Sequence, residues 1–165
     1  ARGIVTEMSL KIRNLSLDLR PAMLDDFGLF AALEWLFERY TKQTQIKINH
    51  NFSFINEQRF PRSVETAAFR IIQESLTNVA RHADSSVVDV NIWVKDNLEV
   101  EISDFGQGFD IVIVEAKNRQ STGISSMRER AALLGGEFSV ASSPGSGTIV
   151  RAVFDIVEGS ENVQN

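Results

Sequence analysis

Residues 74–83 read Glu-Ser-Leu-Thr-Asn-Val-Ala-Arg-His-Ala, and this stretch decides the fold. It completes an apolar stripe with helical spacing, made of Val64, Ala68, Ile72, Leu76, Val79 and Ala83. Because successive helical residues are turned by about 100°, a polar set falls on a face roughly opposite this stripe. That set is Glu74, Asn78, Arg81 and His82. The spacing predicts a helix from about Ser63 to His82 with one buried and one polar face.

The residue types on the polar face suit a phosphate and metal site, although a plain solvated surface explains them as well. The Asn78 carbonyl is a hard neutral oxygen that can complete an octahedral Mg²⁺ shell beside phosphates. Arg81, on the same face, can pair with phosphate oxygens. Glu74 can act as a base or orient one. For His82, a hydrogen-bonded position at the end of the helix is an equally simple interpretation.

A second motif lies toward the C-terminus, where residues 104–109 read Asp-Phe-Gly-Gln-Gly-Phe after an apolar segment. Aspartate only accepts hydrogen bonds, so Asp104 can accept one from the exocyclic amine of adenine. The oxygen that guanine carries at that place would repel it. Gly106 and Gly108 allow the backbone to turn and to approach a ligand closely. A strand followed by a glycine turn is a common structural feature, so the motif gains weight from its position after the Asn78 helix.

Two further glycine segments follow. Residues 122–130 read Thr-Gly-Ile-Ser-Ser-Met-Arg-Glu-Arg, and the backbone N–H groups of a helix opened by Gly123 can receive a phosphate chain. A simple helix cap by Thr122 or Ser125 is the alternative. Residues 145–148 read Gly-Ser-Gly-Thr, by itself a β-turn, and only its order suggests that Thr148 meets the base. Neither a P-loop nor a Rossmann glycine pattern is present.

The remaining pattern predicts an α+β fold. Helices are expected at 4–20, ending before Pro21, from a cap at Asp25 or Asp26 to about Lys42, and at 125–134 before Gly135 and Gly136. Strands are expected at 45–54, 87–94, 98–102, 137–141 and 148–156, and a mobile loop at 113–122. Because the strands come largely as hairpins, we expect a two-layer α/β sandwich in which helices cover one face of a mixed sheet.

Composition narrows the class of protein. The 165 residues suit one domain with an appended segment. The net charge of -5 argues against broad nucleic-acid affinity, and no apolar run approaches the roughly 20 residues that span a bilayer. With no cysteine there is no disulfide framework or thiolate metal site. The sequence does not open with a signal peptide, and its start inside a helical pattern suggests an excised fragment; a cytoplasmic location, in a soluble protein or in the cytoplasmic part of a membrane-bound protein, is expected only from the resemblance given below.

In their order and spacing, these motifs resemble the ATPase superfamily of histidine kinases, DNA gyrase, the Hsp90 chaperones and MutL. Residues 74–83 are similar to its N box, residues 104–109 to its first glycine box, and the segment from Gly123 to its second. Leu-Arg-Pro at 19–21 with Leu-Asp-Asp-Phe-Gly-Leu at 24–29 is similar to the nitrate-sensor and DesK-like histidine kinases. So is Met-Arg-Glu-Arg-Ala at 127–131 with Leu-Gly-Gly at 134–136. The resemblance extends to about Ile156.

This resemblance implies a role for each motif. Glu74 would be the catalytic acid/base residue, and Asn78 would bind Mg²⁺. ATP would lie against the set Asn78, Arg81, His82, Asp104, Gly106, Gly108, Phe109, Gly123, Ile124 and Thr148, with Asp104 and Thr148 at the adenine. Two positions depart from the family pattern: Ser121 stands where a glycine is usual, and Arg81 where lysine is frequent.

The resemblance also implies a division of the chain. Residues 1–20 would be the C-terminal part of the second helix of a dimerisation and phosphoacceptor hairpin, 21–156 the ATP-binding catalytic domain, and 157–165 a disordered tail. His50, on a strand, and His82, in the N box, do not fit the phosphoacceptor, so the accepting histidine would lie outside this sequence.

The implied function is that of a two-component sensor histidine kinase, a magnesium-dependent transferase. It would pass the γ-phosphoryl group of ATP to a histidine of its homodimer and onward to a response regulator, without nucleic-acid or membrane contact by this domain. A catalytically inactive ATP-binding regulatory module and an anti-sigma-factor serine kinase are the alternatives.

Overall fold

The computed structural model describes residues 22–53, 58–117 and 123–156. The predicted helix at 4–20, the tail at 157–165, Ser121 and Thr122 lie outside these ranges. In chain order the elements are α2 (Ala22–Thr44), β1 (Lys47–Phe52), α3 (Arg62–Asn78), the π-helix η1 (Val79–Ala83), β2 (Val87–Val94), β3 (Asn97–Asp104), α4 (Ile111–Lys117), α5 (Gly123–Ala132), β4 (Glu137–Ser142) and β5 (Thr148–Asp155).

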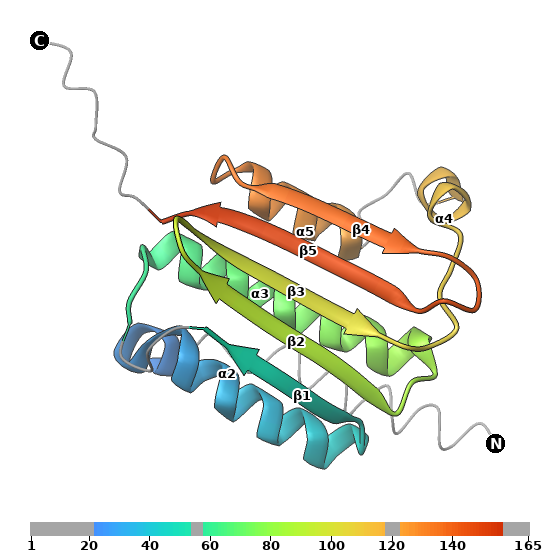
Figure 1. The fold of residues 1–165 in the computed structure, drawn as a ribbon, viewed down its shortest axis with the longest axis horizontal. Coiled ribbons are helices and arrows are strands. Elements are labelled where there is room, and N and C mark those ends of the chain that lie inside the picture. Colours follow the sequence, from blue (N-terminus) through green and yellow to red (C-terminus); the bar gives the residue numbers. More distant parts are fainter. Residues whose placement is uncertain (1–21, 54–57, 118–122, 157–165) are drawn as a thin grey trace, which may run out of the picture.

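The strands form one mixed sheet within the described residues. Its order is β1-β2-β3-β5-β4; β1 and β2 are parallel, and the other neighbours are antiparallel. Helices α2, α3 and α5 lie side by side over one face, and α4 lies apart near the turn between β4 and β5 (Figure 1). The predicted two-layer α+β sandwich is confirmed. No helix of the described part is both long and apolar enough to cross a membrane.

The core lies between α3 and the helical face of the sheet. All the residues of the predicted α3 stripe are buried. Alternate residues of β2 and β3 point toward them, namely Val88, Val90, Ile92, Leu98, Val100 and Ile102, and are almost completely buried. Asp104 continues the alternation of β3 and is itself only 7% exposed, so the strand period of two directs its carboxyl group to the helical side.

The predicted loop at 113–122 is partly wrong, because residues up to Lys117 belong to helix α4. The carboxylate of Asp110 accepts a hydrogen bond from the N–H of Ile113 at 3.1 Å. This side-chain bond satisfies a donor of the first helical turn that would otherwise have no partner. Residues 118–122 lie outside the described ranges.

The last turn of the predicted N-box helix is wider than an α-helix. Regular α-helix ends at Asn78, and η1 continues the chain to Ala83, where Asp84 adopts a left-handed conformation with φ 53°. A π turn is rare; it occurs mostly as a single turn inside an α-helix and is frequent at functional sites. Arg81 and His82 both belong to this turn.

Helix α2 begins at Ala22, before the expected caps Asp25 and Asp26, and is broken at Gly28, where φ is 81° and ψ is -177°. This backbone region is essentially restricted to glycine. A Cβ atom on Gly28 would also lie 2.8 Å from Cδ of Arg59. The predicted caps are wrong because Asp25 and Asp26 already lie inside the helix, which is interrupted only at Gly28.

Arg59 ties the first turn of α2 to α3. Its Nε and Nη2 donate to the two carboxylate oxygens of Glu65 at 3.0 and 3.1 Å, and Nη2 also reaches the carbonyl oxygens of Leu24 and Asp25 at 3.4 and 3.3 Å. Glu65 is 1% exposed, and its hydrogen bond raises the pKa of Arg59. The buried carboxylate is therefore neutralised by a side chain that also holds α2.

We predict that Gly28→Ala destabilises the domain more than Gly135→Ala. Both glycines have positive φ, but a Cβ at Gly135 meets nothing within 4 Å. The control should cost about 1 kcal/mol, whereas Gly28→Ala should lower the free energy of unfolding by about 2 kcal/mol or more, because its backbone region excludes alanine and Arg59 must move. Urea unfolding measures both, and equal losses would contradict the packing of Arg59 on Gly28.

Candidate active site

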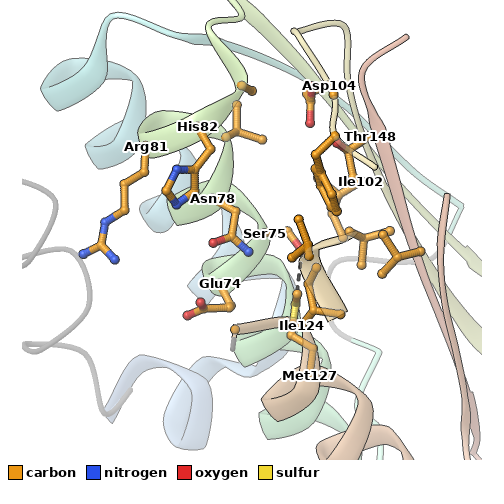
Figure 2. A pocket seen from close by; sticks show the side chains of 18 of the residues that line it. Glu74, Ser75, Asn78, Arg81, His82, Ile102, Asp104, Ile124, Met127 and Thr148 are labelled. Atoms are coloured by element: carbon orange, nitrogen blue, oxygen red, sulfur yellow. Dashed lines mark hydrogen bonds between the residues drawn. The ribbon is translucent and has the colours of Figure 1, made fainter. Parts of the chain in front are cut away.

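A cavity of about 490 Å³ opens between α3–η1, the strands β3 and β5, and α5. Figure 2 shows Glu74, Asn78, Arg81 and His82 following the helical wall, with Asp104, Ile102 and Thr148 opposite and Ile124 and Met127 from α5 between them. The lining includes every predicted site residue except Gly106, namely Glu74, Asn78, Arg81, His82, Asp104, Gly108, Phe109, Gly123, Ile124 and Thr148.

Asp104 and Thr148 form one end of the cavity. They are direct partners in the β3–β5 pairing, so both side chains lie on the same face of the sheet. One carboxylate oxygen of Asp104 accepts the N–H of Gly106 at 2.9 Å. This bond fixes the carboxyl group and leaves its other oxygen available as an acceptor at the cavity wall.

The hydroxyl of Thr148 is oriented by Ser142. The Ser142 hydroxyl oxygen accepts the N–H of Phe109 at 3.0 Å and donates to the carbonyl of Gly147 at 2.9 Å. It lies 3.0 Å from Oγ1 of Thr148. Since Ser142 has only one proton, Thr148 must donate in this pair. The lone pairs of Thr148 then remain free to accept a hydrogen bond, as an exocyclic amine requires.

The glycines of the first glycine box allow backbone segments to touch. A Cβ on Gly106 would lie 1.9 Å from the carbonyl oxygen of Ala83, and one on Gly108, where φ is 59°, would lie 2.1 Å from that of Ser143. Gly106 therefore does not line the cavity but presses the loop against the end of η1. Its effect on a ligand is indirect.

Gly123 brings the start of α5 against Glu74. A Cβ at Gly123 would lie 2.1 Å from Oε1 of Glu74, so only a glycine permits this approach without moving the carboxylate. The carboxylate thus lies beside the positive end of the α5 dipole. Asn78 follows one helical turn later on the same wall (Figure 2).

Comparison with known proteins now identifies the family. Residues 63–158 match the family described as "Histidine kinase-, DNA gyrase B-, and HSP90-like ATPase". The chain belongs to this family. The resemblance inferred from the N box and the glycine boxes is confirmed.

The curated relatives of this ATPase-family chain include a sensor histidine kinase and a sensor protein of staphylococci. It is 36% identical over 159 residues to the oxygen sensor histidine kinase NreB of Staphylococcus carnosus (strain TM300), covering 94% of this chain and 44% of the relative. It is 36% identical over 149 residues to the sensor protein VraS of Staphylococcus aureus (strain COL), covering 90% and 41%. The chain therefore spans less than half the length of these curated relatives.

Solved structures agree on the fold. The histidine kinase domain from the blue-light activated histidine kinase of Erythrobacter litoralis EL346 matches with a TM-score of 0.64 and 25% identity, over 78% of this chain and 61% of that domain. A second structure of that kinase matches with a TM-score of 0.62 and 25% identity, over 78% of this chain and 45% of the other.

The residues of this ATPase-family cavity fit a magnesium ion delivered with a nucleotide. Among the described residues, no three histidine or acidic side chains gather into a group that could hold a metal ion. The amide of Asn78 nevertheless lines the cavity. Mg²⁺ commonly takes one or two protein ligands and fills the rest of its octahedron with phosphate oxygens and water.

Several lining residues were missed by the sequence reasoning. They are Ser75, Val79, Ala83, Ile102, Gln107, Val114, Met127, Val140 and Val150. Ile102 and Val150 could have been found, because each lies two residues from Asp104 or Thr148 on the same strand face. Ser75 contacts Met127 of α5, with 3.5 Å between Oγ and Sδ, a long-range contact that no local pattern indicates. Most of the set forms an apolar floor suited to a flat base.

We predict that Gly106→Ala destabilises the ATPase domain by about 1–3 kcal/mol, because the added methyl group must displace the Ala83 carbonyl. Gly145→Ala, in the β4–β5 turn, is the control, since a Cβ there meets nothing within 4 Å. It should show only the backbone cost of a positive φ, about 1 kcal/mol. Urea unfolding of both variants measures the difference, and a Gly106→Ala chain as stable as wild type would contradict the close contact.

Proposed function

We propose that this chain is the ATP-binding catalytic domain of a two-component sensor histidine kinase. It binds ATP with Mg²⁺ and transfers the γ-phosphoryl group to a histidine outside this sequence, from which the phosphate passes to a response regulator. Residues 21–156 form the catalytic domain, and 1–20 belong to the dimerisation hairpin of a homodimer. The observation that carries the proposal is that Asp104 and Asn78 line one cavity from opposite walls.

The two ends of the cavity suit different parts of the nucleotide. Asp104 and Thr148 offer acceptors over an apolar floor, which suits the amine and the flat ring of adenine. Asn78, Arg81 and His82 offer a metal ligand and basic groups, which suit the phosphates. Gly123 and Ile124 lie at the N-terminus of α5, where backbone N–H groups favour an anion.

Glu74 is the proposed acid/base residue. It lies one helical turn before Asn78, so its carboxylate lies toward the end of the cavity where the γ-phosphoryl group would meet the incoming histidine. Phosphoryl transfer depends mainly on positioning and charge neutralisation. Asn78 and the basic residues should therefore matter more than Glu74 as a proton acceptor.

The names of the relatives favour this function over its alternatives. NreB is named an oxygen sensor histidine kinase and VraS a sensor protein. These names do not favour an inactive regulatory module or an anti-sigma-factor serine kinase. A cytoplasmic location agrees with the use of ATP.

The direct test mixes this chain with the separately produced dimerisation hairpin of its parent kinase, γ-labelled ATP and magnesium chloride. We expect label on the hairpin that is lost in acid and stable in base, as phosphohistidine is. ATP binding without any label on the hairpin would overturn the transfer step. Acid-stable label would indicate a serine or threonine instead.

We predict that Asn78→Ala abolishes this labelling, because the metal loses its protein oxygen and the phosphates are no longer held. Asn91→Ala is the matched control: the same residue type on β2, on the face of the sheet opposite the helices. It should label at the wild-type rate. Raising the magnesium concentration should partly restore labelling in Asn78→Ala, and full activity of that variant at low magnesium would contradict the assignment of Asn78.

We predict that Asp104→Asn weakens ATP binding by about tenfold or more, since an amide N–H₂ then faces the adenine amine. The amide oxygen can still accept the Gly106 N–H, so the unfolding temperature should barely change. Asp96→Asn, on the exposed turn before β3, is the matched control. Calorimetric titration gives the affinities, and equal binding by Asp104→Asn would refute its contact with the base.

A further inference from the structure

Gln107 joins three segments that are distant in the sequence. Its backbone N–H donates to the carbonyl of Ala83 at 2.7 Å, and its own carbonyl accepts the N–H of Gly145 at 2.6 Å. Its side-chain Nε2 donates to the carbonyl of His82 at 2.5 Å. One residue thus links the end of η1, the first glycine box and the β4–β5 turn.

Two of these bonds close the π turn. A helix leaves its last carbonyl groups without intrahelical partners, and η1 ends at Ala83 with Asp84 in the left-handed conformation. Gln107 supplies a donor to His82 and another to Ala83. The uncommon wide turn is therefore completed from outside, by the loop that also carries Asp104.

The turn that Gln107 closes presents the basic residues of the cavity. Arg81 and His82 both line it (Figure 2); His82 carries one of the two capped carbonyls, and Arg81 is the residue before it. We propose that the Gln107 side chain is a positioning residue, which holds η1 in the geometry that directs Arg81 and His82 toward the nucleotide. This inference rests on the proposed ATP site.

The side chain can be separated from the backbone in an experiment. Any residue except proline at position 107 keeps the N–H bond to Ala83, whereas only the amide of the side chain supplies the bond to His82. Gln107 is exposed, so replacing its amide should cost little stability. Gln107→Met has similar length, no charge and no donor, and it removes the His82 bond alone.

A matched control exists at the end of α2. Nε2 of Gln45 donates to the carbonyl of Lys42 at 3.0 Å, which is also a side-chain cap on a helix end, but Gln45 does not line the cavity. Gln45→Met should therefore bind ATP as wild type does.

The first measurement is the ¹H–¹⁵N spectrum of the nucleotide-free chain. For Gln107→Met we expect amide shifts across residues 79–84 and an unfolding temperature close to wild type. Shifts confined to the neighbours of residue 107 would overturn the positioning role, and this outcome does not depend on whether the chain binds ATP.

The second measurement is the affinity for ATP with magnesium, by calorimetry, for wild type, Gln107→Met, Arg81→Ala and the double variant. Loss of one positioning hydrogen bond should weaken binding by about three- to tenfold. If Gln107 acts through the turn, its loss should weaken ATP binding by less than that factor when Arg81 is already alanine, because the two losses overlap. The double variant should therefore bind almost as well as Arg81→Ala alone.

Each other outcome has a distinct meaning. Wild-type affinity in Gln107→Met, or fully additive losses in the double variant, would overturn the inference; additivity would indicate direct contact of Gln107 with the nucleotide. A wild-type chain that fails to bind ATP would instead contradict the proposed function.

Discussion

The end of the α3–η1 helix touches the first glycine loop at a point where no side chain fits. A Cβ on Gly106 would overlap the carbonyl of Ala83, and one on Gly147 would come within 2.0 Å of the carbonyl of Asp104. Three layers of backbone are therefore stacked directly: helix end, loop and β4–β5 turn. Because main-chain atoms cannot change rotamer to make room, this stack fixes the distance between the wall that carries Asn78 and the wall that carries Asp104.

Much of this arrangement follows from local patterns in the sequence. The helical period predicts which face of α3 is buried, and the strand period places Asp104 on the helical side. The pairing of Asp104 with Thr148 is a register between strands 44 residues apart, and only the packed sheet sets it. The π turn, the break at Gly28 and the cap of α4 escaped prediction because each depends on a partner outside its own element or on a single side-chain hydrogen bond.

The cavity lies between the strands and α3 on one side and α5 and α4 on the other. The strands and α3 supply most of the buried core, α5 adds the buried Met127 and the partly buried Ile124, and α4 carries the exposed Val112 and Ile113. Glu74 lies where these two parts meet, with its carboxylate against Gly123. A phosphate at the start of α5 would therefore share the positive end of the helix dipole with the Glu74 carboxylate.

Arg59 gives α2 and α3 a connection much shorter than the chain itself. Leu24 and Arg59 are 35 residues apart in the sequence. The Arg59 guanidinium nevertheless contacts both the Leu24 carbonyl and the carboxylate of Glu65, which is 1% exposed. Pulling the first turn of α2 away would break the hydrogen bonds from Nη2 of Arg59 to the carbonyls of Leu24 and Asp25, whereas the ion pair between Arg59 and Glu65 would remain. A displacement of the first turn of α2 would therefore act on Arg59 and, through its ion pair with Glu65, on the first turn of α3, the helix whose far end carries Glu74 and Asn78.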